Sequence, residues 1–311
     1  MTANVREENI LPNSKMKVVY ICLCIIFFCL FVGYVQQNKI YIFSSTQSKI
    51  TLCSFSSDSH LQACAKFRDL AKDFYDVMTF TEEDIRDFYN SDAVKPIVYR
   101  NDGSLGQGFG YYVFKPYIIL QTLKRVPIGA IVLYSDCDME KYKDYQNVLS
   151  NVHVENVFRA VKFQNIYVQH SSFLNGSYCK RDVLISMNCD TPTFRKSPQL
   201  QANLIALRNT PETQSIINEW LSWCTHIDNL VCGEDDLEMR KKYPEKNVSK
   251  YGHLEHETFA AHRHDQAILT CLLHEKKMFV CEGDRMLKKD KNVECFHLDD
   301  YQESKKQLRG F

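Results

Sequence analysis

The sequence lacks an excess of either charge, because 38 Lys and Arg residues balance 38 Asp and Glu residues in a chain of 311. It also lacks a dense block of Lys and Arg, which argues against a nucleic-acid-binding surface. The mean hydropathy of -0.32 excludes a polytopic membrane protein. The sequence contains no internal repeat, no low-complexity tract and no C-x-x-C pair with matching His residues that would indicate structural zinc. Tryptophan is scarce, with two residues.

The chain does have one long apolar run near its N-terminus. Residues 18–35 carry no charge and are long enough to span a bilayer together with their flanks. Lys15 and Lys17 precede this run, so the positive-inside rule keeps the N-terminus cytoplasmic and sends the bulk of the chain into the lumen. A cleaved signal peptide is the alternative, although the end of the run lacks a small-x-small cleavage pattern. We predict a cytoplasmic tail over residues 1–17, a signal anchor over 18–35, a short stem over 36–49 and a lumenal domain over 50–311.

The cysteines and sequons agree with this topology. Three of the 13 cysteines lie in the apolar run and the other ten follow it, an even number that is compatible with disulfides in an oxidising lumen. Cys137 is the cysteine that we expect to stay free. Asn175 and Asn247 begin Asn-x-Ser sequons, and we expect one or both to carry glycans. Together these features predict a single-pass type II membrane protein of the Golgi or endoplasmic reticulum.

The lumenal part opens with a strand, a helix and a second strand. Residues 49–55 have strand character, apolar positions at helical spacing follow them, and residues 75–80 predict the next strand. Nucleotide-binding α/β sheets often begin with such a βαβ unit. Ser54 and Phe55 then lie at the carboxyl end of the first strand, where a nucleotide base would bind. The alternative is that both residues belong to an ordinary core strand.

The most informative segment for function covers residues 131–138. Four apolar residues predict a strand buried on both faces, and Asp136 and Asp138 follow it two residues apart. Ligands of open α/β sheets bind beyond the carboxyl ends of strands, and carboxylate oxygens suit a Mg²⁺ or Mn²⁺ ion that also binds a diphosphate. We therefore predict a divalent ion and a diphosphate at both acids; a solvated turn after a strand is the alternative. A polar helix over residues 139–149 follows.

A segment rich in glycine and aromatic residues precedes that strand. Residues 106–110 lack the G-x-G-x-x-G pattern of a phosphate-binding loop, so we interpret the glycines as positions of close packing and the aromatics as core. Pro116 is well placed to begin a helix, which should end before Val126, the residue that precedes the next proline. Lys115 stands just before this helix, where it either reaches a phosphate or remains solvated.

The middle of the chain predicts a strand over residues 166–168 and two helix starts. Lys180 stands at the start of a short helix. Thr210 and Pro211 form the stronger start, with the threonine as N-cap and the proline at the first helical position. Trp220 lies on the apolar face of the second helix, so we place it in the core rather than at a substrate.

The last informative segment begins another helix. Apolar positions at helical spacing over residues 268–273 place Asp265 at the N-cap. Capping alone would explain an aspartate there, but His264 and Gln266 flank it. A group of imidazole, carboxylate and amide at a helix start can also bind hydroxyls and transfer a proton. We take these three residues as the candidate catalytic group.

Several of these segments occur in the same order in a family of GT-A-fold glycosyltransferases, whose members read roughly G-Y-G-Y-W-x-W-K-P, Y-x-D-x-G/D, K-R-D and H-R-H-D-Q-S. The sequence resembles that family over about residues 100–275. The Lys-Arg-Asp and His-Arg-His-Asp-Gln segments together are specific to this family, whereas any single segment is not. Ala267 departs from the family, because it replaces a serine whose hydroxyl therefore cannot be essential here. The matching segments are Gly110-Tyr111-Tyr112 with Lys115-Pro116, Tyr134 to Asp138, Lys180-Arg181-Asp182, Cys189 to Pro192, Ser197 to Gln199, the Thr210 to Trp220 helix, and His262 to Gln266.

The resemblance implies a metal-dependent hexosyltransferase that uses a nucleotide-diphosphate sugar as donor. It also implies a single GT-A domain, which is a Rossmann-like α/β/α sandwich. The acceptor would be a hydroxyl of a glycan, glycoprotein or lipid. Many GT-A enzymes use a histidine near the C-terminus as a further metal ligand. The implied roles are metal and diphosphate binding at Asp136 and Asp138, metal binding at His297, sugar or diphosphate contacts at Lys180, Arg181 and Asp182, and donor or acceptor contacts at Asp265 and Gln266.

Two other classes share some of these features. A type II lectin or receptor without catalysis also has an anchor, a stem, disulfides and sequons, but the βαβ pattern and the scarcity of tryptophan argue against it. A metal-dependent phosphoryl- or nucleotidyl-transferase also uses Asp-x-Asp. It normally needs a further carboxylate cluster or a phosphate-binding loop, and the sequence contains neither.

Overall fold

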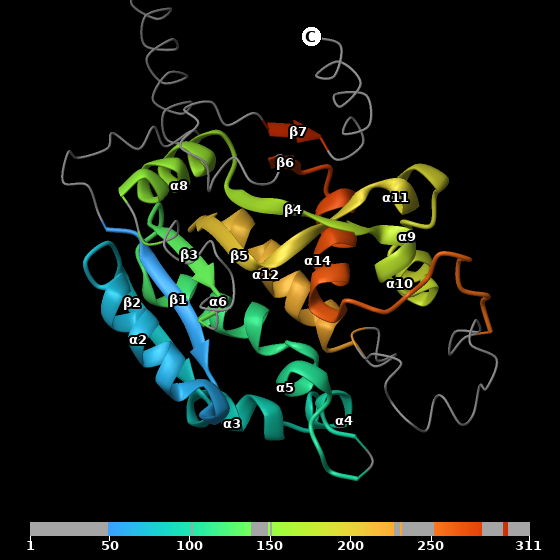
Figure 1. Ribbon diagram of the computed structural model, residues 1–311, viewed down its shortest axis with the longest axis horizontal. Coiled ribbons are helices and arrows are strands. Elements are labelled where there is room, and N and C mark those ends of the chain that lie inside the picture. The colour runs from blue at the N-terminus through green and yellow to red at the C-terminus, as the bar shows by residue number, and fades with distance from the viewer. Residues whose placement is uncertain are drawn as a thin grey trace, which may run out of the picture. The chain divides into compact units, whose positions relative to one another are not determined.

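Figure 1 shows the computed structural model of the chain, in which helices pack on both faces of a mixed β-sheet. The elements described here all belong to one unit, Ser48–Phe311. Within the described residues no helix is long and apolar enough to cross a membrane, and the predicted span over residues 18–35 lies outside them. The structure describes residues 49–100, 102–137, 149, 151–226, 231, 252–281 and 295–297.

The predicted βαβ unit opens the sheet. β1 (Thr51–Ser56) and β2 (Asp76–Thr81) pair in parallel, as the sequence predicts. The short 3₁₀ helix η1 (Asp58–His60) and α2 (Leu61–Ala71) connect them, and α2 buries three residues at helical spacing against the sheet. α3 (Glu82–Asn90) then starts with a capping box, which satisfies backbone donors at its first turn.

The strand β3 (Ile131–Ser135) pairs in parallel with the other side of β1, so the order of strand addition reverses at β1. All five of its residues are buried, which confirms the predicted buried strand. The long strand β5 (Pro198–Arg208) runs antiparallel between β3 and β4 (Ile166–Leu174). The full order is β2-β1-β3-β5-β4-β6-β7, with β6 (Phe279–Cys281) and β7 (Cys295–His297) at one edge.

Two hydrophobic clusters lie on opposite faces of the sheet, because alternate residues of a strand point to opposite sides. Val132 and Tyr134 belong to one cluster, whereas Ile131 and Leu133 belong to the other. The result is a three-layer, Rossmann-like α/β domain. The first face carries α6 (Phe114–Arg125), α12 (Pro211–Cys224) and α14 (His264–Glu275), and the second carries α2 and α8 (Asn151–Phe163).

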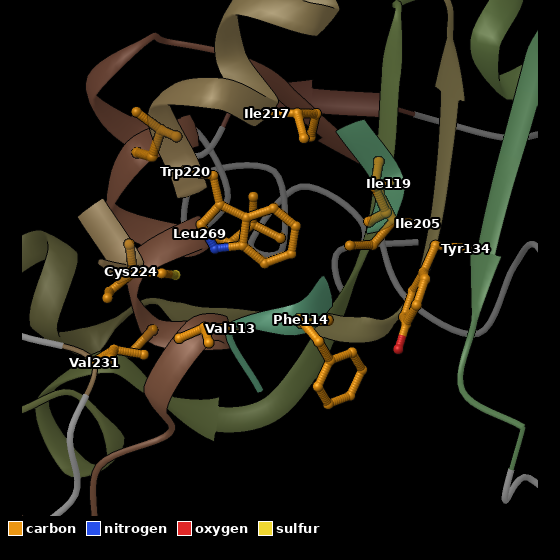
Figure 2. Packing of buried hydrophobic residues seen from close by; sticks show 14 of the residues in the cluster. Val113, Phe114, Ile119, Tyr134, Ile205, Ile217, Trp220, Cys224, Val231 and Leu269 are labelled. Carbon is orange, nitrogen blue, oxygen red and sulfur yellow. The ribbon is translucent and has the colours of Figure 1, made fainter. Parts of the chain in front are cut away.

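Trp220 is the largest fully buried side chain of the first face. Its indole N–H donates a hydrogen bond to the backbone oxygen of Asp265 at 3.0 Å. Figure 2 shows its ring near Leu269, with Tyr134 at the edge of the same cluster. This confirms that Trp220 is a core residue, and it shows that α12 packs against the start of α14.

Two helix starts differ from the prediction. α6 begins at Phe114, so Pro116 is its third residue rather than its first. A proline is tolerated there because the N–H groups of the first turn have no intrahelical partner. α14 begins at His264 with Arg263 as N-cap, and the N–H groups of residues 266 and 267 bond the Arg263 carbonyl. Asp265 is therefore inside the first turn and does not cap the helix.

Other helix boundaries follow the prediction. α10 (Arg181–Ser186) begins directly after Lys180, and the hydroxyl of Thr210 accepts the capping hydrogen bond at the start of α12. α6 ends at Arg125, as the proline at position 127 requires. The remaining helices in the described part of the chain are α4 (Lys95–Val98), α5 (Gln107–Tyr111), α9 (Asn175–Tyr178) and α11 (Pro192–Lys196).

The prediction that Cys137 is a free cysteine is wrong. Cys137 forms a disulfide with Cys64 of α2, and the two Cα atoms are 4.9 Å apart. The residues are 73 positions apart in the sequence, which is why spacing alone did not pair them. Both belong to the cluster between α2 and the sheet, so the fold brings the end of β3 against α2.

The predicted helix over residues 139–149 lies outside the described residues, apart from Leu149.

The sequon asparagine Asn175 is fully buried. Its Nδ2 donates to the backbone oxygen of Phe194 at 3.2 Å and to the hydroxyl of Ser197 at 3.1 Å. A glycan on this nitrogen would remove these contacts and has no room in the core. The fold therefore opposes the expectation that Asn175 carries a glycan, whereas Asn247 lies outside the described residues.

If the lumenal topology is right, the second sequon should carry the glycan. We expect Ser249→Ala to abolish the mobility shift that a glycosidase produces on the protein from secretory cells. Ser177→Ala is the matched variant, because it removes the first sequon and leaves the contacts of Asn175 in place; it should not change the shift. Loss of the shift in Ser177→Ala alone would contradict the buried position of Asn175, and absence of any glycan would contradict the topology.

Candidate active site

The candidate site begins at the carboxyl ends of β1 and β3, the point where strand order reverses. Open α/β sheets bind ligands at such a switch point. The hydroxyl of Ser54 donates to the backbone oxygen of Ser135 at 2.8 Å, which joins the two strand ends. Asp136 follows directly, and its N–H bonds the carbonyl of Asn203 in β5 at 3.0 Å. The first acid of the predicted pair therefore lies where a substrate is expected.

Lys115 is buried against Asp136, although the sequence suggested a phosphate contact or a solvated lysine. The side chain comes from the second residue of α6 and is 5% exposed. Its Nζ lies 3.2 and 3.3 Å from the two carboxylate oxygens of Asp136 and donates to the carbonyl of Ala202 at 3.1 Å. Burial opposes the charge, but Asp136 and Asp265 raise the pKa of Lys115 above its ordinary value. The ammonium therefore stays charged.

Tyr134 completes the surroundings of this ion pair. Its hydroxyl donates a hydrogen bond to Oδ1 of Asp136, and burial together with that carboxylate raises the pKa of Tyr134 well above its usual range. Sequence reasoning missed this role. The spacing of two residues offered a signal, because residues i and i+2 of a strand point to the same side. Tyr134 and Lys115 together hold the Asp136 carboxylate in a fixed orientation.

Asp265 is a buried carboxyl group that interacts electrostatically with Lys115 and Asp136. It is 2% exposed, and among the described residues its Oδ2 has no hydrogen-bond partner. Burial raises its pKa to about 7; the charge of Lys115 lowers the value and that of Asp136 raises it. A carboxyl group that titrates near neutral pH can both accept and donate a proton. The structure thus places Asp265 near Lys115 and Asp136, which come from distant parts of the sequence.

A left-handed turn in the glycine-rich segment places an aromatic ring beside Lys115 and His264. Five successive residues, Gly108 to Tyr112, have φ angles of 60°, 58°, 78°, 58° and 63°. Each residue with a side chain costs about 1–2 kcal/mol in this conformation. The turn places the Tyr112 ring centre 4.9 Å from the Lys115 Nζ and 6.0 Å from the His264 ring. His264 itself has a φ of 47°, and its Nδ1 lies 2.9 Å from the carbonyl of Val231. Strained backbone therefore concentrates around the candidate site.

Three other residues that the sequence predicts for the site, Gln266, Ser54 and Phe55, contact other groups of the protein. The Nε2 of Gln266 donates to Oε1 of Gln199 at 2.9 Å, so this amide links α14 to β5. Phe55 stacks on Phe114 with ring centres 4.2 Å apart, within the core. Contact of Ser54 and Phe55 with a nucleotide base stays a prediction, because both side chains face the protein here.

The Lys180-Arg181-Asp182 segment contacts the chain that leads into α14. The N–H of Lys180 donates to Nδ1 of His262 at 3.3 Å. The guanidinium of Arg181 pairs with Asp190 at 3.1 Å. Asp182 is buried, and its Oδ1 is without a hydrogen-bond partner among the described residues. The segment is therefore held beside the start of α14, and its contact with a sugar or diphosphate stays a prediction.

The predicted metal ligands are described only in part. Asp138 lies outside the described residues, and of His297 the structure describes the backbone, in β7, but not the side chain. Within the described part of the chain, no group of three or more His, Cys, Asp or Glu side chains is arranged to hold a metal ion. The metal site stays a prediction.

Comparisons with known proteins do not identify a family for this chain. No protein-family model matches the chain, and no curated protein matches it. Among solved structures, the chain is similar to the apo form of mouse xyloside xylosyltransferase 1, with 12% sequence identity over 73% of this chain and 82% of that chain. The TM-score is 0.34, a likeness too low to establish a shared fold or activity.

The left-handed turn predicts a difference between two glycine substitutions. A Cβ added at Gly108 would lie 2.1 Å from Cζ of the Tyr112 ring, so Gly108→Ala should displace that ring and lower the free energy of unfolding by about 1–3 kcal/mol more than the control. The control is Gly103→Ala, whose φ of +82° is also positive but whose added Cβ meets nothing within 4 Å. Urea denaturation measures both. Equal losses would contradict the contact between Gly108 and Tyr112.

The raised pKa of Asp265 predicts a pH dependence of stability. Because the folded protein holds this proton up to about pH 7 and the unfolded chain releases it near 3.8, stability falls as pH rises between these values. Asp265→Asn cannot ionise and escapes this loss, which is at most roughly 4 kcal/mol. The melting temperature of Asp265→Asn should therefore rise relative to that of the wild type between about pH 4 and about pH 7. A difference that does not change with pH would contradict the buried ionisable carboxyl.

Proposed function

We propose that the protein is a glycosyltransferase that moves a hexose from a nucleotide-diphosphate sugar to a hydroxyl of a glycan, glycoprotein or lipid. The observation that carries this proposal is the Lys115–Asp136 ion pair at the strand switch point, together with the buried Asp265 carboxyl that interacts electrostatically with both. These residues come from three separate segments that also resemble one GT-A glycosyltransferase family in sequence. A mixed α/β domain with a ligand-binding switch point suits a nucleotide donor.

In this proposal Asp265 acts on the acceptor. Transfer requires an acceptor hydroxyl to attack the sugar carbon while the bond to the diphosphate breaks, and the hydroxyl must lose its proton. The Oδ2 of Asp265, which has no hydrogen-bond partner among the described residues, would take that proton, and a pKa of about 7 suits the task. His264 and Gln266 precede and follow Asp265 in the sequence, and in this proposal they would orient the hydroxyl or the donor sugar. Lys115 compensates the charge that Asp265 gains.

We further propose a Mn²⁺ or Mg²⁺ ion held by Asp136, Asp138 and His297. The carboxylate oxygens of Asp136 are the ligand type that these ions prefer, and 26% of its side chain is exposed. When bound, such an ion neutralises charge on a leaving diphosphate. Lys115 and Tyr134 already bond the Asp136 carboxylate, so the protein's own residues orient it. Ser54, Phe55 and the Lys180-Arg181-Asp182 segment would contact the rest of the donor.

The cellular setting is also part of the proposal. The charge-free run over residues 18–35 with its preceding lysines supports a type II anchor in the Golgi or endoplasmic reticulum membrane, with the catalytic domain in the lumen. The disulfide between Cys64 and Cys137 agrees with an oxidising compartment. The comparison of the two sequon variants tests this topology as well.

The decisive assay is turnover of nucleotide sugars by the full chain in detergent. Release of nucleoside diphosphate should stop in EDTA and resume when Mn²⁺ is restored. Asp265→Asn should lower the rate by about 10²-fold or more, in the range of a lost proton-transfer group. Asp69→Asn is the matched control, because this carboxylate lies on the exposed surface of α2. An Asp265→Asn variant as active as the control would remove Asp265 from the reaction, and no turnover with any donor would overturn the proposed function.

A further inference from the structure

Two charged groups that the proposed reaction uses are closed off from solvent in this structure. Asp265 is 2% exposed and Lys115 is 5% exposed, whereas 26% of the Asp136 side chain is exposed. A proton passes from a hydroxyl to a carboxylate only when the two oxygens lie about 3 Å apart. An acceptor therefore reaches Oδ2 of Asp265 only after a neighbouring part of the protein moves.

Tyr112 places a half-buried aromatic ring against the same group. Its ring centre is 4.9 Å from Nζ of Lys115 and 6.0 Å from the ring of His264, the residue before Asp265. Tyr134, the other ring that the structure describes beside this ammonium, is 1% exposed and belongs to the core. Of these two rings, that of Tyr112 alone extends to the surface.

Two adjacent tyrosine rings of the glycine-rich segment pack in the same way but differ in exposure. A Cβ added at Gly106 would lie 2.2 Å from the ring of Tyr111. A Cβ added at Gly108 would lie 2.1 Å from the ring of Tyr112. The ring of Tyr111 is buried in the hydrophobic core and anchors the segment, whereas that of Tyr112 is held between Gly108 and Lys115.

The backbone that carries the Tyr112 ring favours its movement. Gly108 and Gly110 precede it with φ angles of 60° and 78°, and glycine also adopts negative φ angles without steric cost. Tyr112 itself has a φ of 63°, which is unfavourable for a residue with a Cβ. A return of Tyr112 to a negative φ would release this strain and move its ring relative to Lys115.

We propose that the ring of Tyr112 is a movable cover of the candidate site. In the closed state, which the structure shows, the ring excludes water from Lys115 and Asp265. In the open state the ring leaves Lys115, and an acceptor hydroxyl reaches Oδ2 of Asp265. Exclusion of water matters because a water molecule at Oδ2 would attack the donor in place of the acceptor. The entry of an acceptor rests on the proposed function, whereas the cover itself does not.

Carbodiimide labelling of carboxyl groups tests the cover without an assay of activity. The full chain in detergent reacts with a water-soluble carbodiimide and glycine ethyl ester, and peptide mass spectrometry follows the rate at which each carboxyl group forms an amide. Asp265 should be labelled at least about 10-fold faster in Tyr112→Ala than in the wild type, because the site is then open in most molecules. Tyr112→Phe keeps the ring and should be labelled at the wild-type rate.

Two other carboxyl groups are internal controls. Asp182 is as buried as Asp265 but lies on α10, so its labelling rate should be the same in every variant. Asp69 is exposed on α2 and gives the rate of an open carboxyl group. An unchanged rate at Asp265 in Tyr112→Ala would overturn the proposal, and so would an equal acceleration at Asp182, which indicates general loosening. If Tyr112→Ala does not fold, Gly108→Ala takes its place, because the added Cβ displaces the same ring.

A second measurement connects the cover with the proposed reaction. Loss of the ring admits water, so Tyr112→Ala should raise the ratio of donor hydrolysis to sugar transfer by about 10-fold, and Tyr112→Phe should not. An unchanged ratio in an active Tyr112→Ala enzyme would contradict the exclusion of water by the ring. If the wild type turns over no donor, the proposed function fails, and the labelling of Asp265 still decides whether Tyr112 covers the site.

Discussion

The ion pair between the buried Lys115 and the partly exposed Asp136 is the constraint on which the candidate site depends. Removing Asp136 would leave the buried ammonium of Lys115 without its compensating charge; the cost is about 3–5 kcal/mol in a fully buried pair, and the partial exposure of Asp136 makes it smaller here. The pair fixes the start of α6 to the end of β3, and the bond from Lys115 to the Ala202 carbonyl adds β5. The positive charge of the same ammonium also interacts with the Asp265 carboxyl. Three elements of the fold and both acids of the site are therefore arranged around one charge.

The strained backbone around Tyr112 and His264 is the second feature that needs explanation. Residues with side chains adopt the left-handed conformation only where surrounding contacts determine it. Here the Tyr89 hydroxyl bonds the Phe109 carbonyl, and the Tyr111 ring lies 5.2 Å from that of His264. These contacts join the glycine-rich turn to the start of α14. Strain of this kind concentrates at functional sites, which agrees with a proton-transfer role for Asp265.

Sequence patterns predicted the elements that carry strong local signals. The buried strand before Asp136, the βαβ opening and the helix after Thr210 follow from apolar runs and capping residues. β5 was not predicted, because a mostly buried strand that begins at a proline resembles a loop when its antiparallel neighbours are unknown. The left-handed turn and the disulfide of Cys137 depend on distant contacts and leave no local pattern. The sequence indicated Asp136 and Asp265 separately, whereas their common partner Lys115 emerged only from the fold.

The central claim is that the switch point beside the Lys115–Asp136 pair binds a nucleotide diphosphate. A thermal-shift screen tests it most directly, because a ligand that binds the folded state alone stabilises it by mass action. The full chain in detergent would be screened against nucleoside diphosphates and their sugars with Mn²⁺, beside Asp136→Asn and the surface control Asp69→Asn. The account predicts that at least one nucleotide raises the melting temperature of the wild type and of Asp69→Asn but not of Asp136→Asn. An equal shift in all three proteins, or no shift with any nucleotide, would contradict it.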